Sequence, residues 1–209
     1  MLLDPAEQWI GSLGAIAGLA TLAYAIVGMF KSLRQPSGRE ELGARFALRA
    51  PVILVATIRF VTVAAMLWRP LPVQPQSWLR VGLLSVGTVL FFGGLALYLW
   101  GMRSLGQMFG PSSGFGVRLY AKHRLVTSGP YAHVRHPMYL AVISAAIGSL
   151  LLYRTWASLG FAIIMFGLAV RARREEGVLS LEFGAEWEAY ASHVPPWLPH
   201  LRARKLGGT

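Results

Sequence analysis

Long uncharged apolar runs alternate with clusters of charged residues along this chain. A helix needs about 20 apolar residues to cross the hydrocarbon core of a bilayer. The runs predict five transmembrane helices, at residues 9–30, 50–68, 81–100, 138–153 and 155–170. Only Arg154 separates the last two runs, which are the shortest, so we expect them to form an antiparallel pair joined by a tight turn. The pattern indicates an all-α integral membrane protein in which residues 1–209 form a single membrane domain.

Basic residues are distributed unevenly over the two sides of the membrane in this five-helix arrangement. Most of the 20 Lys and Arg residues fall within 31–49, 101–137 and 171–205, whereas Arg69, Arg80 and Arg154 lie on the opposite side. Cytoplasmic loops carry the excess of basic residues, so we expect the N-terminus outside and the C-terminus in the cytoplasm. The first run follows two acidic residues instead of a basic segment, which argues against a cleaved signal peptide.

Composition excludes several function classes. Only 14% of the residues are charged and 55% are hydrophobic, while a soluble domain carries about a quarter charged residues. The net charge of +11 reflects mainly the orientation in the membrane, because the basic residues flank apolar runs instead of forming a folded basic face. We therefore expect no nucleic-acid partner. The absence of cysteine excludes a disulfide framework, a thiolate nucleophile, an iron–sulfur cluster and a cysteine-based zinc site.

Two segments outside the apolar runs hold most of the polar material, residues 101–137 and 171–199, and both are predicted to be cytoplasmic. The first is too long for a simple connection, and loops of such length tend to be functional or disordered. In the second, Leu179, Phe183, Trp187 and Tyr190 follow helical spacing and predict an amphipathic helix that ends before the two prolines at 195 and 196.

A dense polar cluster leads into the fourth apolar run. It consists of His123, Arg124, Tyr131, His133, Arg135, His136 and Tyr139. Pro137 is suited to the first turn of a helix, where backbone N–H groups and the helix dipole favour an anion such as a carboxylate or phosphate. An interfacial belt that only anchors the helix end is the alternative. A metal is not expected, because neither a carboxylate nor a cysteine lies nearby and Pro137 restricts His136.

Three further charged residues are candidates for the site. Arg171 and Glu175 stand four residues apart after the fifth run and therefore share one helix face. Arg59 lies at the centre of the second run, and intramembrane charges normally face the protein interior and a partner. We expect Arg59 to line a substrate cavity, the alternative being an arginine that bonds backbone carbonyls and fixes helix packing.

Three stretches together resemble the isoprenylcysteine carboxyl methyltransferases and the related membrane phospholipid N-methyltransferases. They are HRLVTSGPYAHVRHPMYLAVI at 123–143, the pair Glu175 and Glu176, and FGAEWEAYASHVPPWLP at 183–199. The resemblance implies that S-adenosylmethionine binds without a Rossmann domain, in a cytoplasmic pocket between the motif loop and the C-terminal helix. It implies these cofactor-binding residues: His123, Arg124, Leu125, Val126, Tyr131, His136, Pro137, Met138, Tyr139 and Glu175.

The resemblance also suggests roles around the methyl acceptor. Arg171 falls where the family places a substrate-contacting arginine, and His193 stands where the carboxyl methyltransferases carry an arginine. We therefore interpret Arg171 and His193 as catalytic, and Arg171 and Arg59 as substrate-binding. A carboxylate acceptor needs no general base, whereas an amine or phenol would make His193 or Glu176 a candidate base.

The resulting hypothesis is an integral membrane methyltransferase that uses S-adenosylmethionine to methylate the carboxylate of a lipid-like substrate. Phosphatidylethanolamine N-methylation is the alternative within the same chemistry. A membrane reductase of sterol-type lipids and a non-enzymatic scaffold are the alternatives outside it.

Overall fold

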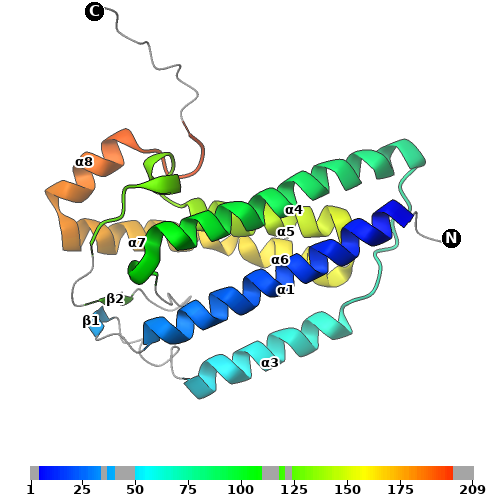
Figure 1. The fold of residues 1–209 in the computed structure, drawn as a ribbon, viewed down its shortest axis with the longest axis horizontal. Coiled ribbons are helices and arrows are strands. Elements are labelled where there is room, and N and C mark those ends of the chain that lie inside the picture. The colour runs from blue at the N-terminus through cyan, green and yellow to red at the C-terminus, as the bar shows by residue number, and fades with distance from the viewer. Residues whose placement is uncertain (1–4, 34–36, 41–49, 110–117, 121–123, 200–209) are drawn as a thin grey trace, which may run out of the picture.

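The chain folds mainly into helices in the computed structural model, which describes residues 5–33, 37–40, 50–109, 118–120 and 124–199 (Figure 1). The α-helices are α1 (Pro5–Leu33), α3 (Ala50–Met66), α4 (Ser77–Leu105), α5 (Pro137–Tyr153), α6 (Trp156–Met165), α7 (Gly167–Phe183) and α8 (Ala185–His193). The described residues also form short elements: 3-10 turns η1 (Gly106–Met108) and η2 (Gly129–Ala132), and strands β1 (Ser37–Glu40) and β2 (Arg118–Tyr120).

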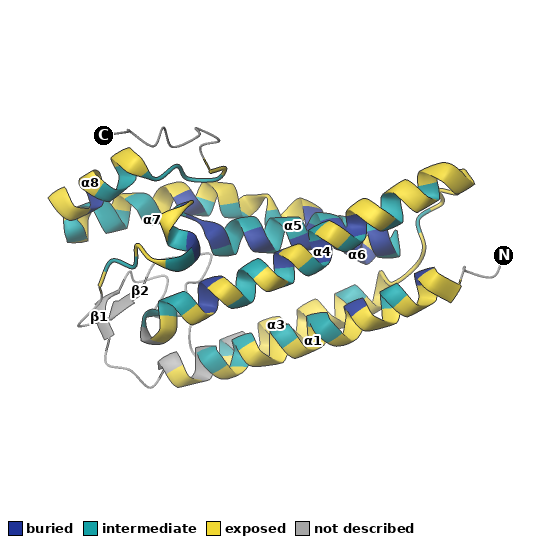
Figure 2. Cartoon of the chain, turned by 45° about the horizontal axis from the view of Figure 1, so that its top comes forward, coloured by how far each residue is buried: buried dark blue, intermediate teal, exposed yellow. Residues whose placement is uncertain are grey.

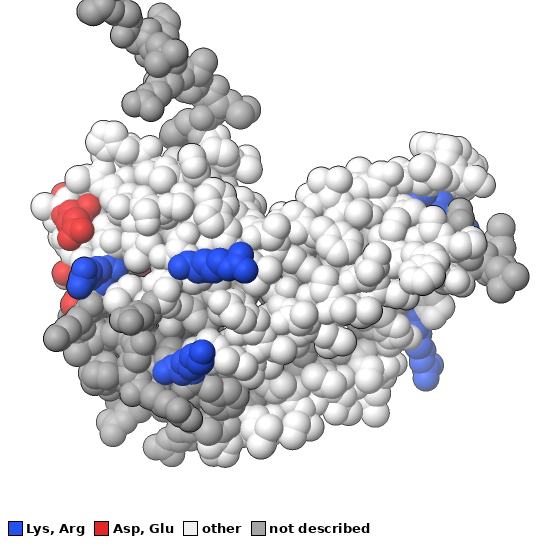
Figure 3. Space-filling view, in the orientation of Figure 1, with Lys and Arg blue, Asp and Glu red and all other residues white. Residues whose placement is uncertain are grey.

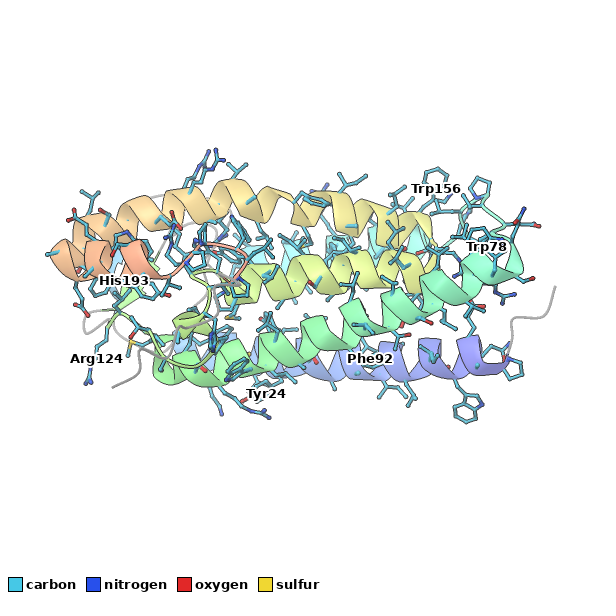
Figure 4. All side chains as sticks on the ribbon, turned by 90° about the horizontal axis from the view of Figure 1, so that it is seen from above. Tyr24, Trp78, Phe92, Arg124, Trp156 and His193 are labelled. Atoms are coloured by element: carbon cyan, nitrogen blue, oxygen red, sulfur yellow. The ribbon has the colours of Figure 1, made fainter. Side chains whose placement is uncertain are left out.

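The helices form an elongated bundle with two distinct ends. Helices α1, α3, α4 and α5 and the α6–α7 pair run along it in alternating directions, so that η2, the start of α5, the end of α7 and α8 gather at one end (Figure 1). We call this the α8 end, and the other, where α5 turns into α6, the turn end. Figure 4 shows Arg124 and His193 toward the α8 end and Trp78 and Trp156 toward the turn end.

Each of the five apolar runs is helical in this structure. Three segments are long and apolar enough to cross a membrane: Pro5–Gly28, Ser77–Leu105 and Trp156–Phe183. Two shorter apolar helices, Leu54–Met66 and Pro137–Tyr153, correspond to the second and fourth runs. The all-α fold class is therefore confirmed in its main feature, and the number of crossings stays a prediction.

The closest helix contact is between α4 and α5, where small residues let the two backbones approach. A Cβ added at Gly94 would lie 2.7 Å from the Ala141 carbonyl oxygen, and one added at Gly148 would lie 2.7 Å from the Cα of Phe91. Small residues at such contacts allow close packing of helices within a membrane. This close contact supports α5, the helix that carries the site.

Large apolar side chains cover the outside of the bundle, particularly on α1 and α3 (Figure 2). Trp9, Leu19, Ile58 and Val63 are each more than half exposed, whereas a soluble protein rarely exposes such extensive apolar surface. On the face drawn in Figure 3, charged side chains lie toward the two ends and the middle is uncharged. This distribution suits a helical bundle surrounded by lipid.

Ionic and backbone contacts join the helices at the turn end. Arg154 ends α5 with a φ of 48°, and Thr155 caps α6 by accepting a hydrogen bond from the backbone N–H of Ser158 at 3.1 Å. The tight turn at Arg154 is confirmed. The buried carboxylate of Glu7 bonds both Arg80 and Arg154 and so joins α1, α4 and the α5–α6 turn.

The structure corrects one sequence expectation and adds one feature to the predicted fold. The apolar stripe from Leu179 to Tyr190 does not lie on one helix, because Gly184 takes a φ of 49° and separates α7 from α8. Glycine tolerates this left-handed conformation at no steric cost, which explains the break. The added feature is a short antiparallel pair between β1 and β2, with Ser37 opposite Tyr120, which leaves the all-α fold class unchanged.

Candidate active site

Tyr139 is at the centre of a polar cluster that joins the first turn of α5 to α7. Its hydroxyl donates a hydrogen bond to Glu175 Oε2 at 2.6 Å and accepts one from Arg171 Nε at 2.8 Å. The Arg171 guanidinium carbon lies 5.9 Å from the centre of the Tyr139 ring. The four-residue spacing of Arg171 and Glu175 places both side chains on the α7 face that meets α5. Three residues of the sequence-based hypothesis are thus brought together.

This cluster has unused hydrogen-bonding capacity. Arg171 Nη2 is buried without a hydrogen-bond partner in the part of the chain that the structure describes. A buried charged donor left unpaired costs free energy, so such an atom indicates a missing acceptor. Glu175 is half-buried, and its Oε1 has no hydrogen-bond partner among the described residues. The cluster can therefore bind a ligand that offers an anionic acceptor and, close to it, a hydroxyl or amine donor.

His136 packs against Tyr139 and is one of the most buried polar residues among those described, at 5% exposure. Its ring is stacked with the Tyr139 ring, with centroids 5.6 Å apart and planes at 6°. His136 Nε2 lies 2.8 Å from Glu176 Oε1, which also accepts a hydrogen bond from Arg135 Nε at 2.9 Å. The adjacent glutamates therefore have different partners, Tyr139 for Glu175 and the Arg135–His136 pair for Glu176.

The segment after α8, Val194–Trp197, lies against this motif, and we call it the strap. The backbone N–H groups of Arg135 and His136 donate to the carbonyls of Pro195 at 2.8 Å and Pro196 at 3.2 Å. Trp197 contributes an aromatic ring 5.5 Å from that of His136. The C-terminal segment and the motif loop are therefore in direct contact, while the cofactor pocket that the resemblance implied between them stays a prediction.

A second contact holds α8 on the 3-10 turn η2. Tyr190 Oη donates to the Tyr131 carbonyl oxygen at 2.7 Å, and burial raises the pKa of Tyr190 to about 12. The pKa of the Tyr131 side chain is also raised, first by burial and then by the negative charge of Glu175. Both phenols are therefore neutral at physiological pH, and the Glu175 carboxylate acts on Tyr131 as well as on Tyr139.

The remaining cofactor candidates lie around this cluster or outside the described residues. Pro137 is fully buried and begins α5, as predicted, and Met138 packs beside Gly101 of α4. Leu125 and Val126 are half-buried, and Arg124 is exposed at the α8 end (Figure 4). His123 lies outside the described residues.

Two predicted site residues are not brought to the cluster. His193 is exposed at the end of α8, where its Nδ1 is 2.8 Å from the Ala189 carbonyl oxygen and 2.9 Å from Ser192 Oγ. Arg59 is exposed on α3, and neither of its predicted surroundings, a cavity or a set of backbone carbonyls, is present among the described contacts. Their roles in catalysis and substrate binding stay predictions.

Several contributors to the site were not identified from the sequence. Trp197 and the Tyr190 hydroxyl had no assigned partner, and Arg135 was noted only as a member of the polar cluster. The available signal for Arg135 was its position directly before His136 and Pro137. That position does not reveal contacts with α7 and with the Ala191 and Val194 carbonyls, to which Arg135 Nη1 donates at 2.9 Å each.

Comparison with known proteins assigns the segment that carries this geometry. Residues 86–181 match the model of the isoprenylcysteine carboxyl methyltransferase (ICMT) family. Over these residues, which are fewer than half of the chain, the sequence is similar to the ICMT family. The matched segment begins within α4, ends within α7 and includes Tyr139, Arg171 and both glutamates of the pair. The resemblance inferred from the motifs is therefore confirmed.

Curated relatives match the chain over limited lengths. The protein-S-isoprenylcysteine O-methyltransferase of Schizosaccharomyces pombe is 37% identical over 79 residues, which are 37% of this chain and 34% of the relative. The human protein of the same name is 36% identical over 87 residues, 40% of this chain and 30% of the relative. The matched part therefore spans about a third of these two relatives.

A relative with a different name matches a longer stretch. The nickel-cobalt-cadmium resistance protein NccN of Alcaligenes xylosoxydans xylosoxydans is 29% identical over 134 residues, covering 60% of this chain and 54% of that protein. Within the described residues, no group of three or more His, Asp and Glu side chains is placed to hold a metal ion. The geometry therefore gives no support for metal binding at the described site.

Proposed function

We propose that this chain is an integral membrane methyltransferase that uses S-adenosylmethionine to methylate the carboxylate of a lipid-like, isoprenylcysteine-type substrate. The observation that carries the proposal is the buried Nη2 of Arg171 beside Tyr139 and Glu175, which lacks a hydrogen-bond partner within the described part of the chain. The ICMT-family match supports the reaction type. The names of the curated relatives support an isoprenylcysteine acceptor.

The donors and acceptors of the cluster fit the methyl donor. S-adenosylmethionine carries an amine and ribose hydroxyls. The Oε1 atom of Glu175, which has no hydrogen-bond partner among the described residues, can accept a hydrogen bond from one of these donors. Leu125, Val126 and Met138 supply apolar surface nearby in sequence or space, as expected for the pocket that the family resemblance implies. When bound, S-adenosylmethionine supplies a methyl group on a positively charged sulfur, which leaves as a neutral thioether.

Arg171 is the proposed ligand for the substrate carboxylate. A guanidinium can bind a carboxylate through two parallel hydrogen bonds, and the bond from its Nε to Tyr139 fixes the plane of the group. Fixing both reactants in line contributes much of the acceleration of such a displacement, because the entropy cost of alignment is met on binding.

The arrangement favours carboxylate over amine methylation. A carboxylate attacks the methyl carbon through an oxygen lone pair and releases no proton, so the site needs no general base. His193 bonds within its own turn of α8, and Glu176 Oε1 is shared by two donors. Neither candidate base is presented to Tyr139 and Arg171 in the described structure. Phosphatidylethanolamine N-methylation therefore remains the less supported alternative.

Ligand binding and a paired substitution test this function. S-adenosylhomocysteine should raise the melting temperature of the detergent-purified protein, whereas NADPH should not. Arg171→Met should lower kcat/KM for an isoprenylcysteine substrate by roughly 100-fold, the effect of losing a charged hydrogen bond of about 3 kcal/mol. Arg173→Met is the matched control, because Arg173 is exposed on the same helix. A melting shift with NADPH alone would favour a reductase, and no shift with either ligand would favour a scaffold.

We further propose that the α8 end faces the cytoplasm and that the N-terminus lies outside. The clustering of Glu7, Arg80 and Arg154 at the turn end supports the prediction that these residues share the side poor in basic residues. Reporters fused to each terminus in intact cells test the orientation. A cytoplasmic signal from both termini would rule out an odd number of crossings.

A further inference from the structure

Glu176 connects two parts of the chain through a single oxygen atom. Its Oε1 accepts from Arg135 Nε at 2.9 Å and lies 2.8 Å from His136 Nε2, so α7 is tied to the residues directly before α5. The side chains of Arg135 and His136 are 13% and 4% exposed, and that of Glu176 is 26% exposed. A buried arginine is permanently charged and needs this carboxylate, because an unpaired charge in such surroundings is costly.

The contacts lead from Glu176 to Tyr139 without Glu176 touching Tyr139. The contact between Nε2 and Glu176 fixes one edge of the His136 ring. The face of this ring is stacked almost parallel on the Tyr139 ring, and the ring is also in contact with Trp197. The orientation of the His136 ring thus limits where the Tyr139 phenol can lie. That phenol in turn bonds both Arg171 and Glu175, the residues proposed to meet the ligands.

Arg135 extends the same connection to the strap. Its Nη1 donates to the Ala191 and Val194 carbonyls, and its guanidinium lies 5.9 Å from the centre of the buried Trp187 ring. Glu176 fixes the other edge of the same guanidinium through Nε. Loss of the carboxylate would therefore loosen the strap, whose carbonyls accept the backbone N–H groups of Arg135 and His136.

We propose that Glu176 is a positioning residue for methyl transfer, which orients the Tyr139 phenol through His136 and keeps the strap docked through Arg135. The adjacent glutamates then have separate roles. Glu175 binds the methyl donor, and Glu176 fixes the positions of Tyr139 and the strap. The effect on rate rests on the proposed function. The effect on the strap does not, because it concerns only contacts within this chain.

Hydrogen exchange at two backbone amides tests the proposal directly. The amides of Arg135 and His136 bond the strap, so their exchange reports whether it is docked. In the ligand-free, detergent-purified protein, Glu176→Ala should accelerate both by about tenfold or more, since local opening becomes easier. Glu175→Gln is the matched control, which should leave this exchange unchanged and should weaken S-adenosylhomocysteine binding in titration calorimetry.

A conservative variant separates positioning from proton transfer. Glu176→Gln keeps an oxygen acceptor, so it should restore slow exchange and most of the kcat that Glu176→Ala loses, a loss of about 10- to 100-fold. The KM for the methyl acceptor should change little in Glu176→Ala. A general base would instead lose activity as fully in Glu176→Gln as in Glu176→Ala, with normal exchange in both, and that pattern would overturn the proposal.

The remaining outcomes are also decisive. Unchanged exchange of the two amides in folded Glu176→Ala would overturn the proposal. If Glu176→Ala does not fold, Arg135→Lys replaces it, because one ammonium cannot keep the contacts of Nε and Nη1 together, and unchanged exchange in that variant would overturn the proposal equally. If the wild-type protein binds no S-adenosylhomocysteine and transfers no methyl group, the proposed function fails, while the exchange comparison still decides whether Glu176 holds the strap.

Discussion

Gly93 and Gly94 offer a comparison that isolates the close contact between α4 and α5. A Cβ at Gly94 would lie 2.7 Å from both the Ala141 carbonyl oxygen and the Ala145 nitrogen, whereas a Cβ at Gly93 has no heavy atom within 4 Å. The atoms opposite Gly94 belong to the backbone of α5, so they cannot move aside by a side-chain rotation. Gly94→Ala therefore has to displace one helix from the other.

The expected free-energy difference follows from two terms. Alanine is favoured over glycine within a helix by about 1 kcal/mol, and both variants gain this term because both residues lie inside α4. Overpacking costs about 1–3 kcal/mol and applies only to Gly94→Ala. The propensity term cancels in the comparison, so Gly94→Ala should be less stable than Gly93→Ala by about 1–3 kcal/mol.

Thermal unfolding in one detergent measures this difference. For a chain of this size, 1–3 kcal/mol corresponds to a difference in melting temperature of about 2–12 °C. Gly93→Ala should be at least as stable as the wild-type protein. This variant is the control for any effect of the extra methyl group. Equal melting temperatures for the two alanine variants would refute the tight α4–α5 contact.

Two other perturbations test the ends of the bundle. Glu7→Gln should lower the free energy of unfolding by about 3–5 kcal/mol, because it leaves two partly buried arginines without their carboxylate. The control Glu186→Gln, on the exposed face of α8, should change the free energy of unfolding by less than about 0.5 kcal/mol. If denaturant titration gave similar free energies of unfolding for the two variants, the ionic contact would be contradicted. Tyr190→Phe should cost about 0.5–1.5 kcal/mol at neutral pH. Because burial raises the pKa of Tyr190 from its ordinary value of 10.0 to about 12, this contribution should be complete below pH 10 and be lost as the pH rises toward 12, and a constant difference between the two proteins over that range would contradict the buried hydroxyl.

The sequence was sufficient for features that depend on local pattern. Uncharged runs predicted the helices, Pro137 predicted the start of α5, and Arg154 predicted the turn into α6. The motif residues predicted the resemblance that the family match bears out, and the four-residue spacing of Arg171 and Glu175 predicted their shared face.

Features that depend on distant contacts could not be predicted in the same way. The apolar residues on both sides of Gly184 have the spacing of one amphipathic helix. The positive φ of Gly184 in the structure shows that the helix breaks there. Glu7 is 73 residues from one arginine partner and 147 from the other, so no local pattern indicates the contact. Glu176 is indistinguishable from Glu175 by residue type, and their different partners follow from how α7 meets α5.

The strap has a further consequence for how this protein avoids unwanted association. Pro195 and Pro196 have no backbone N–H groups, so they can accept hydrogen bonds from Arg135 and His136 but cannot donate any in return. The same two residues therefore cannot extend the contact into a β-ladder with another extended chain. At these positions the chain can lie over the motif without offering a donor edge for a neighbouring polypeptide to join.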